Sequence, residues 1–246
     1  MYSKNHKKIL LIFFYCFTGL IGLLIFDDYG TSIDHDNIRI VGFLSLENIY
    51  NFFKINIPNE ISKITVNQIK FVGDLTPSSG PFFNLVMAFL ELHFGITNTS
   101  QQFFLRHLSS FLLFLTSSYF LFKIILLRYN CYLISLLSVL FLFVSPRIFS
   151  NSFINSNDIV FLSFSLINLY AFIIFFKKPN FLNSTICSLT TALAISSRLF
   201  GLIFLLLAIS IFFIKILRSK NNKKKIYQLI NYIFFTFFFF VILWPY

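Results

Sequence analysis

The chain has 246 residues, of which 57% are hydrophobic, and it carries a formal net charge of +11. A soluble domain of this length could not bury so much apolar surface, so the composition excludes an ordinary soluble enzyme. The basic residues fall mostly in short clusters between apolar runs, which indicates the cytoplasmic loops of a membrane protein and no nucleic-acid partner.

Seven apolar runs reach or approach the roughly 18 residues that a helix needs to cross a bilayer. In chain order these predicted spans are 9–26, 106–127, 131–149, 159–176, 181–197, 199–215 and 226–244. No small-residue cleavage pattern follows the first run, so we interpret it as a retained span and not a signal peptide. The predicted fold class is all-α, a polytopic helical membrane protein with a single membrane domain over residues 1–246.

A long loop, residues 27–105, separates the first two spans and contains two further predicted helices. Residues 36–54 have apolar side chains at helical intervals and follow a capping-box pattern in Thr31–Asp34. Residues 81–95 are apolar but too short for a span, and they include two ionisable side chains. We interpret both segments as interfacial helices that lie on the membrane surface.

The placement of basic clusters predicts the orientation. With the N-terminus in the cytoplasm and 81–95 not counted as a span, the clusters 123–128, 177–178 and 215–225 all lie on the cytoplasmic side. Counting 81–95 as a span would send all of them outside. We therefore expect a multi-pass protein of the inner or plasma membrane, with the loop 27–105 on the extracytoplasmic side.

All nine acidic residues then lie outside: eight in the loop 27–105, and Asp158 in a polar stretch that links the third and fourth spans as a loop. Arg106, Arg147 and Arg198 each stand alone at the outer end of a span. An arginine beside hydrocarbon is costly unless it snorkels to headgroups or pairs with an anion. Snorkelling is the simple alternative, but the guanidinium fork suits phosphate oxygens, and the shared face favours an extracytoplasmic phosphate-binding active site.

The pattern Asp34-His35-Asp36 has the spacing of a weak site for a hard cation. Helix capping explains Asp34, and the helix dipole favours an acid at Asp36, without any metal. A divalent cation at Asp34 and Asp36 is thus an alternative that we do not expect. We also expect no nucleotide and no soluble cofactor.

Four stretches occur in order along the chain: "GTSIDHDNIR", "SSGPFFNLVMAFLELHFG", "LRHLSSFLLFL" and "SPRIFSNSFINSNDIVF". Together they resemble the integral-membrane glycosyltransferases of the GT-C superfamily that use a polyprenyl-phosphate-linked sugar. This class includes the protein O-mannosyltransferases and the lipid A aminoarabinose transferase. Since such proteins continue well beyond the segment that ends here in "ILWPY", the resemblance implies that the chain is their N-terminal module, truncated at the C-terminus, either as a fragment or as a shortened relative.

The resemblance also implies roles for individual residues. The family's catalytic carboxylate corresponds to Asp34, with His35 where Glu is usual, and the acid of the second outer loop corresponds to Asp158. The arginine at the start of the second span corresponds to Arg106, which we expect to bind the donor phosphate together with Arg147 and Arg198. The predicted supporting residues are His35, Asp36, Arg39, Gly80, Pro81 and Asn155.

These observations predict an enzyme that moves a sugar from a polyprenyl-phosphate donor to a glycan, lipid or protein acceptor on the extracytoplasmic face. Two alternatives stay open: a flippase or transporter of a lipid-linked sugar, and a catalytically inactive scaffold. Transporters commonly place polar residues at the bilayer midplane on discontinuous helices. Here the polar residues gather at one face, beside a long loop, which favours the enzyme.

Overall fold

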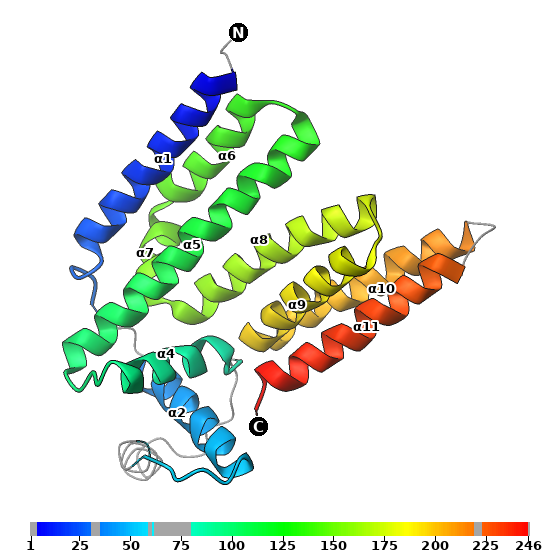
Figure 1. The fold of residues 1–246 in the computed structure, drawn as a ribbon. Coiled ribbons are helices and arrows are strands. Elements are labelled where there is room, and N and C mark those ends of the chain that lie inside the picture. The colour runs from blue at the N-terminus through cyan, green and yellow to red at the C-terminus, as the bar shows by residue number, and fades with distance from the viewer. Residues whose placement is uncertain (1–3, 31–34, 59–60, 62–79, 219–222, 246) are drawn as a thin grey trace. The chain divides into compact units, whose positions relative to one another are not determined.

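The computed structural model describes residues 4–30, 35–58, 61, 80–218 and 223–245, and every regular element in these residues is a helix (Figure 1). The all-α prediction is therefore confirmed. Tertiary contacts divide the chain into two compact units. Unit 1 combines residues 1–32 with 99–170, and unit 2 combines residues 33–98 with 171–246.

Unit 1 is a bundle in which α5 packs against α1, α6 and α7 (Figure 1). Its helices are α1 (Lys4–Ile25), α5 (Thr99–Tyr129), α6 (Tyr132–Val144), α7 (Pro146–Ile154) and the part of α8 (Ser156–Lys177) up to Tyr170. Its core is aromatic: the ring of Phe111 on α5 stacks on Phe153 of α7 with 4.7 Å between the centroids. Rings packed in this way contribute through both buried area and favourable ring geometry.

The predicted span 131–149 is not one helix, which corrects the sequence interpretation. Helix α6 ends at Val144, α7 begins at Pro146, and the two axes differ by 66°. The cause is Pro146, because a proline has no N–H to donate and pushes the preceding residue out of the α conformation. Ser145 accordingly is extended, with φ −66° and ψ 108°. The polar stretch that we predicted as a loop is therefore largely helical, in α7 and the first turns of α8.

Unit 2 contains two groups of helices. The first is the pair α2 (His35–Phe52) and α4 (Phe82–His93). The second consists of the remainder of α8, α9 (Phe181–Ser197), the 3-10 helix η1 (Leu199–Gly201), α10 (Leu202–Leu217) and α11 (Lys223–Leu243). Within the second group, the buried hydroxyl of Tyr232 on α11 lies 2.9 Å from Oγ1 of Thr191 on α9, which satisfies both polar groups inside an apolar core.

Five helices in the described residues are long and apolar enough to cross a membrane: residues 5–25, 99–129, 156–177, 199–217 and 225–243. The bent pair α6–α7 is a sixth candidate. Helix α9, predicted as a span, has 17 residues and is slightly short for one. The chain is a multi-pass helical membrane protein, and the number seven stays a prediction.

The two predicted interfacial segments are helical. Helix α2 covers His35–Phe52, against a prediction of 36–54, and α4 covers Phe82–His93, against 81–95. Pro81 stands at the N-cap of α4, as expected for a residue that lacks an N–H. The location of both helices on a membrane surface stays a prediction.

Candidate active site

Arg106 is the most deeply buried cation of unit 1, with 2% of its surface exposed, within the part of the chain that the structure describes. It lies two turns into α5, since this helix begins at Thr99 and not at the predicted residue 106. Gln102 and Ser110, one turn on either side, are also buried and share its helical face. A buried guanidinium holds its positive charge in a water-poor environment, where attraction to an anionic group is strong, so this face of α5 suits an anionic group.

Two hydrogen bonds fix this end of α5. Ser110 donates from Oγ to the Ser152 carbonyl on α7 at 2.7 Å. Nδ1 of His107 lies 3.2 Å from the Phe26 carbonyl oxygen, just beyond the end of α1, and can donate to it in the Nδ1–H tautomer. His107 was not among the predicted site residues, although a histidine inside the apolar run "LRHLSS" was a visible signal. It joins the start of α5 to the segment that carries the exposed acids Asp27 and Asp28.

Arg147 and Asp158, predicted as site residues, are both exposed. Arg147 is the second residue of α7, directly after the bend at Pro146. Asp158 lies in the first turn of α8, where its N–H donates to Oδ1 of Asn155 at 3.1 Å and its Oδ2 accepts from Nδ2 of Asn155 at 2.8 Å. The pair forms a reciprocal N-terminal cap, a role that needs no catalysis and that an acid near a helix N-terminus performs well.

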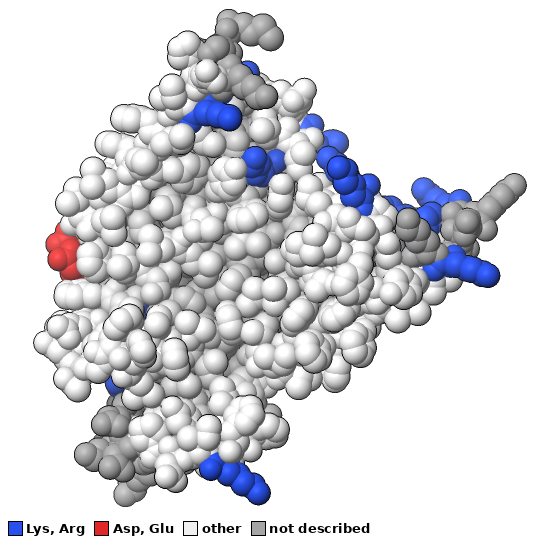
Figure 2. Space-filling view, viewed as in Figure 1, with Lys and Arg blue, Asp and Glu red and all other residues white. Residues whose placement is uncertain are grey.

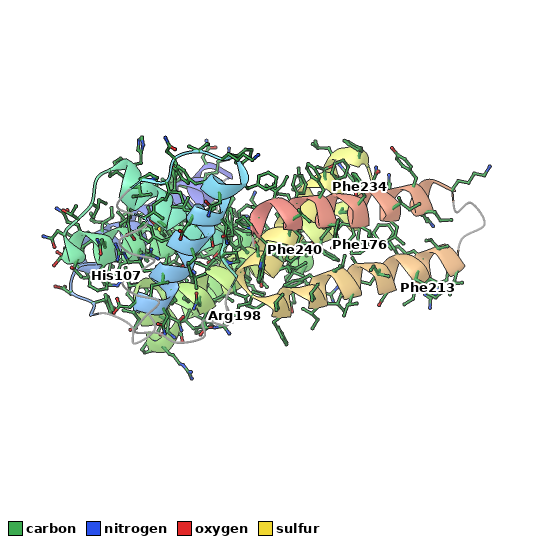
Figure 3. The ribbon with its side chains drawn as sticks, turned by 90° about the horizontal axis from the view of Figure 1, so that it is seen from below. His107, Phe176, Arg198, Phe213, Phe234 and Phe240 are labelled. Carbon is green, nitrogen blue, oxygen red and sulfur yellow. The ribbon has the colours of Figure 1, made fainter. Side chains whose placement is uncertain are left out.

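In unit 2, the Gly80-Pro81 motif lies against the end of α9. The Gly80 N–H donates to the Ser197 carbonyl at 2.9 Å, which places the motif beside Arg198 although the two are far apart in sequence. A Cβ on residue 80 would lie only 1.7 Å from the Ser196 carbonyl oxygen, so only glycine fits there. Arg198 itself is half-buried and extended, and it separates α9 from η1 (Figure 3).

Helices α2 and α4 are joined by a buried ion pair. Nε of Arg39 lies 2.8 Å from Oε2 of Glu91, and these side chains are 12% and 1% exposed. The guanidinium also lies over the ring of Phe43, 5.0 Å from its centroid. The helices approach closely at Gly42, where a Cβ would come within 2.3 Å of the Asn84 carbonyl oxygen. Arg39 was predicted as a supporting residue, whereas its ion-pair partner Glu91 was not among the predicted site residues.

The pair formed by α2 and α4 fixes where the N-terminus of α2 lies within unit 2. Helix α2 begins at His35, and Asp36 is exposed in its first turn. Asp34, the predicted catalytic base, lies outside the described residues. No group of three or more His, Cys, Asp or Glu side chains in the described residues could hold a metal. Because Asp34 is not among them, the alternative of a cation at Asp34 and Asp36 stays open.

Replacing Glu91 with glutamine is expected to lower the free energy of unfolding by about 3 kcal/mol, because it leaves the Arg39 guanidinium largely buried without its counter-charge. The measurement is unfolding of the purified protein in mixed micelles. The matched control is Glu47→Gln, on the half-buried surface of α2, which is expected to change stability by less than about 0.5 kcal/mol. The double variant Arg39→Met/Glu91→Met is expected to recover most of the loss. A double variant as unstable as Glu91→Gln would contradict the ion-pair explanation.

Together these features define a multi-pass helical membrane protein that buries an arginine near one end of a long apolar helix and seats a Gly-Pro motif beside another arginine. The sequence model of the dolichyl-phosphate-mannose-protein mannosyltransferase family matches residues 81–244, and the chain belongs to this family. It is thus a membrane glycosyltransferase of the GT-C type, as the resemblance implied. No curated protein and no solved structure gives a significant match.

The region that matches the family contains several of the predicted site residues. It begins at Pro81 and ends at residue 244, just after α11, so it includes Arg106, Arg147, Asp158 and Arg198. Unit 1 holds Arg106, Arg147 and Asp158, while unit 2 holds Arg198 beside Gly80-Pro81. The assignment of catalytic and phosphate-binding roles to these residues stays a prediction.

Proposed function

We propose that this protein transfers a sugar from a polyprenyl-phosphate donor to an acceptor hydroxyl on the extracytoplasmic face of the inner or plasma membrane. The family description names a dolichyl-phosphate-mannose donor, which is a sugar on a polyprenyl phosphate. The structural observation that carries the proposal is the burial of Arg106 in the apolar helix α5, within the matched region. A glycan, lipid or protein can supply the hydroxyl.

In the proposed reaction, the bond between the anomeric carbon and the phosphate oxygen breaks, and negative charge grows on the phosphate. Arg106 stabilises that charge, because a preorganised cation in a water-poor site acts most strongly where charge develops. Arg147 and Arg198 assist in binding the donor. Asp34 removes the proton from the acceptor hydroxyl, whose oxygen forms the new glycosidic bond.

The remaining predicted residues have positioning roles in this proposal. Asp158, held by Asn155 at 2.8 Å, orients an arginine or the acceptor. The Arg39–Glu91 pair fixes α2, at whose start His35 and Asp36 follow the base. The polyprenyl tail lies along the apolar spans beside the site. The reaction needs neither a nucleotide nor a soluble cofactor.

The test is sugar transfer in proteoliposomes supplied with labelled polyprenyl-phosphate sugars and a mixture of peptide, glycan and lipid acceptors. We expect transfer from at least one donor, with a loss of about 100-fold or more in Asp34→Asn, since general-base catalysis contributes about 10²–10⁴ in rate. Movement of the labelled donor across the bilayer without transfer would favour a flippase. Neither transfer nor movement would favour an inactive scaffold.

A further inference from the structure

An open groove of about 710 Å³ lies in unit 1, between the first turns of α1 and the connection from α5 to α6. Its wall is largely apolar: Ile9, Leu10 and Phe13 come from α1, and Leu133 comes from α6. Its volume is in the range of cavities that bind small molecules. We refer to this feature as the α1–α6 groove.

The α1–α6 groove is held in place by specific contacts. The Tyr132 hydroxyl donates a hydrogen bond to the Lys7 carbonyl, which ties the start of α1 to the connection between α5 and α6. Asn130, in that connection, has φ +49°, a left-handed conformation that asparagine tolerates well in tight turns. These contacts fix the positions of the segments that line the groove within unit 1.

Basic residues lie in the lining of the α1–α6 groove and next to it in sequence. Lys7 lines it, Lys8 follows on α1, and Arg128 lies two residues before Asn130 at the end of α5. The sequence contains no Asp or Glu in residues 4–13 or 119–133, so no carboxylate of these segments balances that charge. Figure 2 shows basic side chains near the start of α1 and acidic ones beside its other end. Basic recesses between membrane helices are suited to anionic lipid headgroups.

The groove is distinct from the candidate active site. Arg106 and Tyr129 are separated along α5 by 23 residues, as the difference 129 − 106 gives. At a rise of 1.5 Å per residue, this corresponds to roughly 35 Å, about the thickness of the hydrocarbon core. The groove and Arg106 therefore lie at opposite ends of a membrane-crossing helix.

We propose that the α1–α6 groove binds an anionic phospholipid from the leaflet at the N-terminal end of α1. The acyl chain lies against Ile9, Phe13 and Leu133, which are all more than 60% exposed in the protein alone. The headgroup phosphate faces Lys7 and Lys8. Charge complementarity selects this occupant, because a zwitterionic lipid offers the same chain but no net negative charge to the basic rim.

The test places a fluorescent reporter in the groove. Trp244, the only tryptophan, is replaced in Trp244→Phe, and Leu10→Trp is added in the groove wall. The protein is reconstituted in bilayers that contain brominated phosphatidylglycerol or brominated phosphatidylcholine at equal mole fraction. We expect the anionic lipid to quench the reporter several-fold more strongly than the zwitterionic one.

Two charge-matched variants decide the origin of that preference. Lys7→Gln/Lys8→Gln is expected to bring the ratio of quenching close to one. Lys177→Gln/Lys178→Gln, which removes two exposed lysines at the end of α8, is expected to leave the ratio unchanged. Equal quenching by both lipids, or no quenching by either, would overturn the proposal. An equal loss of preference in both variants would also overturn it, because the selectivity would then come from general surface charge.

Discussion

Replacing Arg106 with glutamine is expected to lower kcat/KM for sugar transfer by at least about 100-fold, the usual loss when one preorganised group that stabilises transition-state charge is removed. Glutamine keeps a polar side chain but removes the charge that we propose stabilises the leaving phosphate. Because Arg106 is 2% exposed, bulk water does not substitute for it. The loss is expected mainly in kcat, since the charge on the phosphate grows as the bond breaks.

The measurement compares initial rates in proteoliposomes with thermal stability in detergent. Arg106→Lys is expected to recover part of the rate, because lysine keeps the charge but lacks the bidentate fork. The matched control is Arg218→Gln, which removes an exposed arginine just after α10 and is expected to leave the rate unchanged. If Arg106→Gln lowers stability while turnover per folded molecule stays at the wild-type level, Arg106 has a structural role and the proposed phosphate contact is wrong.

The ends of helices could be predicted closely where a local sequence pattern determines them. Helices α2 and α4 begin within a residue of their predicted starts, since amphipathic spacing and a Gly-Pro signal mark those starts directly. The bend at Pro146 was missed because a count of apolar residues treats α6 and α7 as one run. The proline that ends the helix was nevertheless present in the sequence, in the pair Ser145-Pro146.

The candidate site could be predicted only in part, because isolated charges are visible in an apolar sequence and tertiary partners are not. Arg106 is an isolated charge at the start of an apolar run, and its side chain is buried in the structure. In the sequence, Glu91 indicated only that its helix is interfacial. Its partner Arg39 lies 52 residues earlier, so no local pattern shows that the two side chains form an ion pair. Likewise, no local pattern shows that Gly80 meets Ser197, because that contact depends on how α9 ends within unit 2.

The predicted role of Asp158 shows how one residue fits two interpretations. An asparagine followed three residues later by an aspartate is a readable cap, and the structure contains that cap between Asn155 and Asp158. The predicted catalytic role of Asp158 rested instead on its location on the predicted outer side of the membrane and on the family resemblance. Since the carboxylate stays exposed, capping leaves it able to contact a substrate group as well.

Replacing Gly80 with alanine is expected to lower the free energy of unfolding by about 1–3 kcal/mol, the usual cost of forcing an extra carbon into a packed site. The new methyl group would lie 1.7 Å from the Ser196 carbonyl oxygen and 2.9 Å from the Ser197 nitrogen, both backbone atoms that cannot move as a side chain can. Gly80 must therefore withdraw, which breaks its hydrogen bond to the Ser197 carbonyl. Unfolding in mixed micelles measures this loss.

The same displacement is expected to reduce sugar transfer, because it separates the Gly80-Pro81 motif from Arg198, the predicted partner in donor binding. Gly30→Ala is the matched control for stability, since a Cβ at that position comes within 4 Å of no other atom among the residues that the structure describes. It is expected to change the free energy of unfolding by less than about 0.5 kcal/mol. If Gly80→Ala were as stable as Gly30→Ala, the motif would not be seated on α9. If it were destabilised but fully active per folded molecule, the contact would support the fold alone, and Arg198 would act without it.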